Sequence, residues 1–207
     1  MPLRAIELPG ADVSIDTAWL QQSQADALLA ELRRSIPWSV HRIKLFGREV
    51  DSPRLSCWIG DPDARYAYSG THFEPHPWPQ ALLPIRQRLA DDIGTDFDSV
   101  LANLYRDGSD YMGWHSDNEA VLGPQPAIAS LSLGAARRFV LKRRKQEMPV
   151  PEGGNGSSSD TKLALELPHG SLLLMRGYTQ HHYRHALPRT AKPVGARINL
   201  TFRQVLA

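Results

Sequence analysis

Four histidines and one aspartate of this chain have types and positions that suit a redox-active metal. Residues 115–117 read His-Ser-Asp, an H-x-D triplet, and His185 lies far downstream. Two imidazoles and one carboxylate form the facial triad that holds iron(II) and leaves coordination positions open. The triplet alone is weak evidence, because it often arises by chance, and taken alone it is more typical of a surface turn. His181 and His182 compete with His185 as the second histidine.

The stretch 196–205 predicts a β-strand with two different faces. Residues two apart in a strand share a face, so Ile198, Leu200 and Phe202 would face a core. The opposite face is polar and carries Arg197, Asn199, Thr201 and Arg203. Guanidinium groups match carboxylates in a bidentate fork. This face therefore predicts a site for a small dicarboxylate that fills open positions on the metal.

A second strand with a polar face is predicted at 98–107. Asn103 and Tyr105 would share one face, with Ala102 and Leu104 on the other. The strand ends at Asp-Gly-Ser, residues 107–109, which is a turn signal. The H-x-D triplet follows within a few residues. Two strands that present polar groups beside a metal-binding loop predict a pocket.

Five motifs of the chain fit one known family when they are taken together. They are Asn103-Leu-Tyr105, Trp114-His115-Ser-Asp117-Asn-Glu119, Ile128-Ala-Ser-Leu-Ser-Leu-Gly134, His169-Gly-Ser-Leu-Leu and Arg197-Ile-Asn199-Leu-Thr-Phe-Arg203. This set resembles the AlkB family of nucleic-acid dealkylating dioxygenases. The similarity is greatest to the animal-type members that repair alkylated DNA and RNA, and it covers residues 38 to 205.

The resemblance implies a role for each matching residue. The implied iron(II) ligands are His115, Asp117 and His185, the last chosen because it precedes Ala-Leu-Pro and lies ahead of Arg197 as in the family pattern. The implied residues for the cosubstrate 2-oxoglutarate are Asn103, Tyr105, Arg197, Asn199, Thr201 and Arg203. Arg197 would pair with the far carboxylate and Arg203 would steady the near one. His169 is expected in a tight turn before an apolar run.

The resemblance also implies the reaction. Iron(II), 2-oxoglutarate and O₂ would carry the difficult chemistry, while the protein positions and shields the reactants. Decarboxylation of 2-oxoglutarate would yield succinate and CO₂, coupled to hydroxylation of an N-alkyl carbon. The resulting hemiaminal would collapse to an aldehyde and a repaired base. The expected substrates are N1-methyladenine and N3-methylcytosine in DNA, with RNA as a further candidate.

The segment from residue 38 to residue 70 is expected to form a substrate lid. Phe46 falls in a stretch similar to the hairpin that some relatives insert into the base stack, as apolar wedges do. Tyr68 is the candidate that would sandwich the flipped base against His115. Tyr66 and Glu119 are further candidate substrate contacts. The alternative interpretation is that these aromatic residues cover the core, and that Phe46 is an ordinary strand residue.

Basic residues gather in one short part of a chain whose formal net charge is only +2. They are Arg137, Arg138, Lys142, Arg143, Arg144 and Lys145, and no acidic residue lies between Arg137 and Glu147. A solvated hairpin is one interpretation. The other is an edge that grips phosphates, since Lys and Arg contacts with the backbone dominate nucleic-acid affinity. A nuclear import signal at residues 142–145 is a weaker hypothesis.

Composition and length indicate a soluble, non-exported protein. The 207 residues are 42% hydrophobic, enough to fill the core of a single domain. Cys57 is the single cysteine, which excludes an intramolecular disulfide and fits a reducing compartment. The first residues lack the apolar region of a signal peptide, and no apolar run reaches membrane length. We expect a cytoplasmic monomer, or a nuclear one in a eukaryote.

The expected fold is α+β and mainly β. Helices are predicted at 16–35 and 79–93, the second starting late or kinked at Pro84. Short strands are predicted at 99–106, 127–133, 137–143, 162–167, 171–176, 183–186 and 196–205, a pattern of sandwiches and jelly rolls. The resemblance implies a double-stranded β-helix. One domain, 1–207, would comprise a helical extension with the lid, 1–97, and a catalytic core, 98–207. Residues 148–160 are predicted to be a loop.

Two other functions remain open on the sequence. The same iron site could belong to a 2-oxoglutarate-dependent hydroxylase or demethylase of a protein or another non-nucleic-acid substrate. The chain could also be a non-catalytic binder of nucleic acid. The lid aromatics and the basic run favour a nucleic-acid substrate over the first alternative. The complete ligand set argues against the second.

Overall fold

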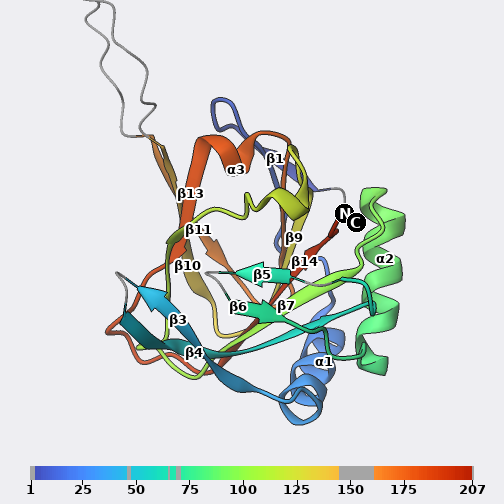
Figure 1. The fold of residues 1–207 in the computed structure, drawn as a ribbon. Helices are drawn as coiled ribbons and strands as arrows, with labels where there is room; N and C mark the ends of the chain where they lie inside the picture. Colours follow the sequence, from blue (N-terminus) through green and yellow to red (C-terminus); the bar gives the residue numbers. More distant parts are fainter. Residues whose placement is uncertain (1–2, 46–47, 65, 69–70, 145–160, 207) are drawn as a thin grey trace, which may run out of the picture.

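Two antiparallel β-sheets pack against each other, and two helices cover one of them (Figure 1). The computed structural model describes residues 3–45, 48–64, 66–68, 71–144 and 161–206. Within these residues, no helix has both the length and the apolarity needed to cross a membrane. The confirmed fold is a mainly β jelly roll with few helices.

The large sheet has eight strands in the order β1-β2-β12-β9-β14-β7-β4-β3. These are β1 (Arg4–Ile6), β2 (Asp12–Asp16), β12 (Leu172–Arg176), β9 (Ile128–Gly134), β14 (Arg197–Arg203), β7 (Ser99–Tyr105), β4 (Arg48–Gly60) and β3 (Ser39–Leu45). The small sheet has four strands in the order β11-β10-β13-β8. These are β11 (Lys162–Leu167), β10 (Arg137–Arg143), β13 (Tyr183–Leu187) and β8 (Met112–His115). A separate pair joins β5 (Tyr66–Tyr68) to β6 (Thr71–Phe73).

Helices α1 (Gln22–Ser35) and α2 (Leu83–Ile93) lie against the outer face of the large sheet. Leu28, Leu32 and Leu89 from these helices share one hydrophobic cluster with Ile198 and Phe202 of β14. A second cluster lies between the sheets and includes Leu173 and Met175 of β12 with Phe139 and Leu141 of β10. The β14 side chains therefore alternate as predicted, with the apolar set under the helices and the polar set between the sheets.

The first helix begins later than the sequence predicted. Residues 16–35 were expected to be helical, but Asp16 ends β2 and its Oδ1 accepts a hydrogen bond from the Ala18 backbone N–H at 2.9 Å. That contact closes a local turn, which competes with a helix. Trp19 and Leu20 are still buried, in the connection that precedes α1. The second helix starts late, as expected, with Pro84 in its first turn after the 3₁₀ turn Gln80–Leu82.

The N-terminal half contributes more to the large sheet than predicted. Strands β1 and β2 were not predicted, and the residues of β3 and β4 were assigned to a lid, with ordinary strand residues at 40–46 as the alternative. The C-terminal part of β4 instead pairs with β7, from Leu55 opposite Leu104 to Gly60 opposite Ser99. Cys57 lies in this part and is buried. Tertiary pairing rather than a local sequence pattern fixes these strands.

Two short helical segments complete the described chain. The single turn α3 (Thr179–His182) lies between β12 and β13, and the 3₁₀ turn η2 (Ala120–Leu122) follows the H-x-D triplet. The predicted loop at 148–160 lies outside the described residues. Strand β8, which carries His115, was not predicted. The other observed strands from β7 onward match the predicted ones to within about two residues at each end, the ordinary uncertainty of element boundaries.

Candidate metal and cosubstrate site

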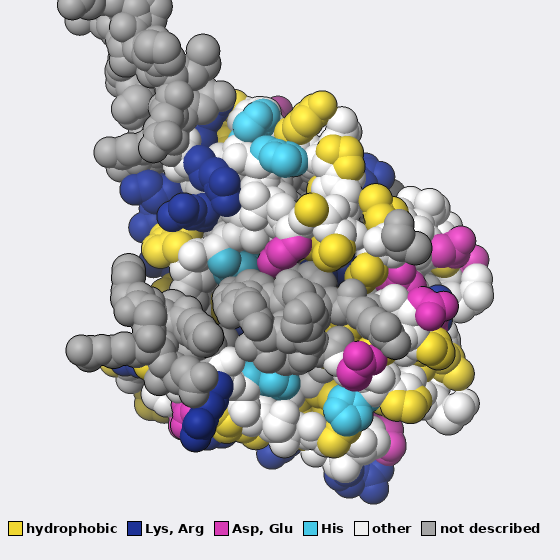
Figure 2. Space-filling model, viewed as in Figure 1, with side chains coloured by type: hydrophobic (Ala, Val, Ile, Leu, Met, Phe, Trp, Pro, Cys, Tyr) yellow, Lys and Arg dark blue, Asp and Glu magenta, His cyan; other side chains and the backbone are white. Residues whose placement is uncertain are grey.

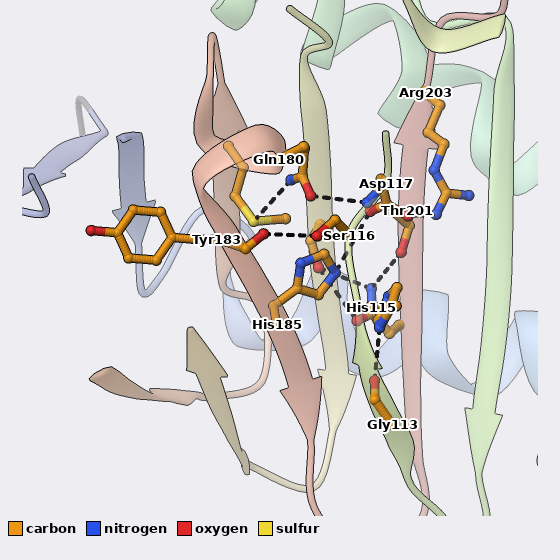
Figure 3. Close-up of polar contacts among 12 residues, drawn as sticks. Gly113, His115, Ser116, Asp117, Gln180, Tyr183, His185, Thr201 and Arg203 are labelled. Carbon is orange, nitrogen blue, oxygen red and sulfur yellow. Dashed lines mark hydrogen bonds and ion pairs between the residues drawn. The ribbon is translucent and has the colours of Figure 1, made fainter. Parts of the chain in front are cut away.

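The structure brings the three predicted metal ligands together between the sheets. His115 ends β8 and lies opposite His185 of the neighbouring strand β13, and Asp117 follows two residues later. Their ligand atoms lie within 4.8 Å of one another. The two imidazole centroids are 4.1 Å apart, and His185 Nε2 is 3.7 Å from Asp117 Oδ2. Figure 3 shows the three side chains converging. Among the described residues, these three side chains form the group of His, Cys, Asp or Glu that could hold a metal ion.

The two competing histidines contact backbone carbonyl groups elsewhere. A ring nitrogen of His181, Nε2, is 2.7 Å from the Pro124 carbonyl oxygen, and His182 Nδ1 is 2.6 Å from the Gly10 carbonyl oxygen. Neither residue lines the cavity that contains His115, Asp117 and His185. Both belong to the single turn α3, which ends directly before β13. The geometry therefore groups His185, and neither of its neighbours, with the H-x-D triplet.

Both imidazoles are in the form that binds a metal. Burial lowers the pKa of His115, and burial with the adjacent His115 lowers the pKa of His185 to about 3. Each ring is therefore neutral near pH 7. His115 Nδ1 is 2.8 Å from the Gly113 carbonyl oxygen, which can only accept a hydrogen bond. The proton is thus on Nδ1, and the lone pair of Nε2 is available to a metal.

Asp117 is held as a carboxylate by its surroundings. Burial opposes its ionisation, but the guanidinium of Arg203 and the two histidines outweigh burial and lower its pKa to about 2. Arg203 Nη2 donates to Asp117 Oδ1 at 2.6 Å. The Asp117 backbone N–H donates to Gln180 Oε1 at 3.0 Å, and Gln180 is itself buried. Side chain and backbone of this ligand are therefore both fixed.

The predicted cosubstrate residues lie on the large sheet, facing the metal ligands. Asn103 and Tyr105 of β7 pair across the strands with Asn199 and Arg197 of β14. Tyr105 and Arg197 also lie close together, with the guanidinium carbon 5.5 Å from the tyrosine ring centroid. The cavity between the sheets is lined by Asn103, Tyr105, Asn199, Thr201 and Arg203 together with His115, Asp117 and His185. Neighbouring strands thus place the metal ligands and all the predicted cosubstrate residues except Arg197 around one cavity, and Arg197 is buried next to Tyr105.

Arg197 fits a carboxylate partner. Its side chain is fully buried, and burial lowers its pKa to about 10, so it remains a cation near neutral pH. Nη2 donates to Ser132 Oγ at 2.7 Å, but Nε is buried and has no hydrogen-bond partner among the described residues. No acidic side chain in the described part of the chain forms an ion pair with it. Buried charges are normally paired, so the residues present suit an anionic cosubstrate.

Two serines beneath this cluster were not assigned a role from the sequence. Ser130 and Ser132 of β9 pair with Thr201 and Asn199 of β14. Ser132 Oγ accepts from Arg197, and Ser130 Oγ accepts from Asn199 Nδ2 at 3.0 Å. A signal was present, because the two serines alternate with buried apolar residues along β9 and so share its polar face.

Arg54 is a third residue to which the sequence analysis gave no role. It lies on β4, is 7% exposed, and donates from Nε to Asn103 Oδ1 at 2.6 Å and from Nη1 to Ser52 Oγ at 3.0 Å. An amide whose oxygen accepts from Arg54 presents its NH₂ group, a donor, to other partners. Arg54 therefore fixes the orientation of a cavity-lining amide. The pairing of β4 with β7 that places it there has no signature in the sequence.

The predicted substrate contacts are only partly placed. Phe46 lies outside the described residues. Tyr66 and Tyr68 lie at the two ends of β5, for which the structure describes the backbone path, and this strand pairs with β6. Glu119 is the residue directly before η2 and does not line the cavity. The roles of these four residues in substrate binding stay predictions.

The basic run contains one residue that the structure removes from any phosphate-binding edge. Arg137 is 3% exposed and donates to three backbone carbonyl oxygens, those of Asp107, Asp110 and Pro188. It ties together the loops at this end of the small sheet. Its neighbour Arg138 is exposed, although the sequence analysis grouped the two arginines in one basic cluster.

Comparisons with known proteins agree with this geometry. The 2OG-Fe(II) oxygenase superfamily model matches residues 12–203. The DNA oxidative demethylase ALKBH2 of Arabidopsis thaliana is 38% identical over 213 residues, 95% of this chain and 67% of that protein. Human ALKBH2 is 35% identical over 206 residues, 98% and 77% of the two chains. The Bos taurus alpha-ketoglutarate-dependent dioxygenase alkB homolog 3 is 36% identical over 194 residues, 93% of this chain and 66% of that protein.

A solved structure, that of OsALKBH1, shares the fold. It superposes with a TM-score of 0.60 at 17% identity and covers 98% of this chain and 100% of that chain. The jelly roll and the family match define an Fe(II)- and 2-oxoglutarate-dependent oxygenase. Within that superfamily the chain belongs to the AlkB-type dioxygenases. The predicted use of Fe(II), 2-oxoglutarate and O₂ is thereby confirmed. The chain spans about two thirds of the length of several of these relatives.

Proposed function

We propose that this protein removes alkyl groups oxidatively from the bases of DNA, as a direct-reversal repair enzyme. The observation that carries the proposal is the opposition of two sets of residues across one cavity. His115, Asp117 and His185 form a candidate iron(II) site on one side. Asn103, Tyr105, Asn199 and Arg203 line the other side, and the buried cation Arg197 lies next to Tyr105. The names of the relatives, DNA oxidative demethylase among them, support DNA as the substrate.

Each residue has a distinct task in the proposed reaction. Iron(II), 2-oxoglutarate and O₂ supply the oxidising power that hydroxylates the N-alkyl carbon. Arg197 binds the far carboxylate of 2-oxoglutarate, and Tyr105 and Asn199 orient it. Asn103 and Arg203 steady the near carboxylate, while Arg203 also holds the carboxylate of Asp117. Thr201 extends the same polar face. The hydroxylated group then leaves as an aldehyde.

N1-methyladenine and N3-methylcytosine are the proposed lesions. Each carries a methyl group on its pairing edge and a positive charge, so the base pairs poorly and costs less to flip out. A cationic ring stacks favourably on electron-rich aromatic faces, which Tyr68 and His115 would provide. Tyr66, Glu119 and Phe46 are proposed as further contacts to the base or the duplex. RNA carrying the same lesions is a candidate substrate as well.

We further propose that the chain works as one monomeric domain. Residues 98–207 would form the catalytic core, and residues 1–97 would supply the covering helices and the substrate lid. A cytoplasmic location, or a nuclear one in a eukaryote, follows from the proposed substrate.

One assay tests the proposal directly. Oligonucleotides that carry a single defined lesion are incubated with the protein, iron(II), ascorbate and 2-oxoglutarate, and the products are weighed by mass spectrometry. We expect loss of one methyl group from each lesion and release of one formaldehyde. The His185→Ala variant is the matched inactive control. Succinate formation without demethylation of either lesion would assign the protein to a different substrate class.

A further inference from the structure

Three arginines at one end of the small sheet make no ion pair with any residue that the structure describes. They are Arg143, the last residue of β10, Arg144, which follows it, and Arg184 of β13. Arg184 is exposed, and no hydrogen bond joins its side chain to a described residue. Figure 2 shows Lys and Arg side chains gathered over this end of β10 and β13, on the same face of the molecule as the β5–β6 pair of Figure 1.

Arg144 connects this cluster to the metal-binding triplet. Its Nη2 donates to the Ser116 hydroxyl at 3.0 Å, and that hydroxyl donates to the Tyr183 carbonyl oxygen at 2.8 Å. Ser116 is the residue between the candidate ligands His115 and Asp117. Arg144 Nε is buried and lacks a hydrogen-bond partner among the described residues. One guanidinium therefore contacts the ligand-bearing segment while its own hydrogen-bonding capacity is only partly used by the described residues.

Arg144 and Arg184 come from neighbouring strands of the small sheet, because Lys142, two residues before Arg144, lies opposite Arg184 in the pairing of β10 with β13. Burial, followed by the charge of Arg184, lowers the pKa of Arg144. Two neighbouring cations that have no acidic partner among the described residues form a site that an anion stabilises, and Arg matches a phosphate in bidentate geometry. Arg137, buried by its three carbonyl contacts, and Arg138, which lies opposite Glu166 of β11, are not needed for this site.

We propose that Arg144 and Arg184 form a phosphate subsite that holds a phosphodiester of the nucleic-acid strand beside the lesion. This inference rests on the proposed function, because it assumes that the target base enters the cavity next to His115 and Asp117. Phosphate contacts position a protein on nucleic acid and carry no sequence information. The subsite would thus fix the strand so that the flipped base reaches the metal, whatever its neighbours are.

The test measures binding of an unmodified single-stranded oligonucleotide by fluorescence anisotropy over a series of salt concentrations. Arg184→Ala should weaken binding roughly tenfold at low salt, the loss expected for one charge-assisted contact. The slope of log K against log salt should become less steep by about 0.7, the value for one phosphate on a single strand. Arg184→Glu should weaken binding further. Turnover of 2-oxoglutarate without oligonucleotide should remain unchanged, since the Arg184 side chain is exposed.

Arg33→Glu is the matched control for charge. Arg33 is an exposed residue in the last turn of α1, on the helical side of the large sheet, and its replacement changes the net charge as Arg184→Glu does. The inference is overturned if these two variants bind the oligonucleotide equally well. It is also overturned if the wild-type protein does not bind the oligonucleotide.

Neutral phosphate analogues locate the contact. Oligonucleotides with one methylphosphonate linkage, moved stepwise along the strand around an N1-methyladenine, should show one or two positions where wild-type binding is weakened. At those positions Arg184→Ala should show no additional loss, because contacting groups are not additive. If the binding losses from the methylphosphonate linkage and from Arg184→Ala add fully at every position, the subsite is refuted. If the wild-type protein fails to demethylate either lesion while Arg184→Ala still weakens oligonucleotide binding, the proposed function is refuted and the phosphate subsite is not.

Discussion

Arg203 donates a hydrogen bond from Nη2 to Oδ1 of Asp117 at 2.6 Å, and both side chains are almost completely buried. This contact joins a residue of the large sheet to a candidate metal ligand that follows the edge strand of the small sheet. It leaves Asp117 Oδ2 on the side of His185, 3.7 Å from Nε2. One oxygen is therefore fixed by the protein while the other remains directed at the site where a metal would bind.

Single alanine substitutions should distinguish the candidate metal ligands from the neighbouring histidines. His115→Ala, Asp117→Ala and His185→Ala should each abolish iron-dependent turnover of 2-oxoglutarate, because each removes one of three donors. His181→Ala and His182→Ala, on the preceding turn, should retain substantial activity. Iron content after anaerobic reconstitution and turnover are the two measurements. An inactive His182→Ala beside an active His185→Ala would reverse the assignment.

Arg197→Ala should weaken the binding of 2-oxoglutarate. The loss of a hydrogen-bonded charge pair in a closed site costs roughly 2–5 kcal/mol, or about 30-fold or more in affinity. Titration of the iron-loaded protein with 2-oxoglutarate gives the dissociation constant. Arg138→Ala, at an exposed arginine of β10, is the control and should leave it unchanged. An unaltered constant in Arg197→Ala would exclude Arg197 from the cosubstrate site.

Arg54→Met should act on the cosubstrate through Asn103. Once Asn103 Oδ1 loses its donor, the amide is free to rotate, and we expect 2-oxoglutarate to bind roughly tenfold more weakly, in the range for hydrogen bonds to charged groups. Asn103→Ala should have a similar effect, and the double variant should lose little more. Additive losses would mean that Arg54 acts independently of Asn103. The free energy of unfolding, measured in parallel, separates this effect from a loss of stability.

Cys57 should be inert in the folded protein. Burial raises the pKa of its thiol to about 12, so at pH 8 the reactive thiolate is about one part in ten thousand, and access is blocked as well. Iodoacetamide should leave the native chain unlabelled and add one group per chain after unfolding in guanidinium chloride. Rapid labelling of the native protein, seen as a mass increase, would contradict the buried position of this residue.

The residues of the site were easier to predict from the sequence than the strand pairings that position them, for a physical reason. The polar faces of β14 and β7 repeat every second residue, so the alternation of Arg197, Asn199 and Arg203 with apolar residues is visible in the sequence. His185, in contrast, could be selected over His181 and His182 only by family resemblance. Its grouping with Asp117 depends on the pairing of β13 with β8, which the sequence does not encode locally.

The missed parts depend on contacts between distant segments. Strand β2 lies beside β12, with Ile15 opposite Leu173, more than 150 residues along the chain. Arg54 reaches Asn103 because β4 pairs with β7. Neither pairing leaves a periodic signal in the residues themselves. The late start of α1 was missed for a different reason, because Trp19 and Leu20 are apolar and buried without being helical.

The distribution of the cavity residues over two sheets has a thermal consequence. The candidate metal ligands come from β8, β13 and the segment after β8, whereas Arg197 and Arg203 come from β14. A metal and a dicarboxylate bound together would thus cross-link the two layers of the jelly roll. A ligand present at one hundred times its Kd stabilises the folded state by about 2.7 kcal/mol. We therefore expect the melting temperature to rise more with both ligands than with either alone, as the layers would have to separate for the chain to unfold.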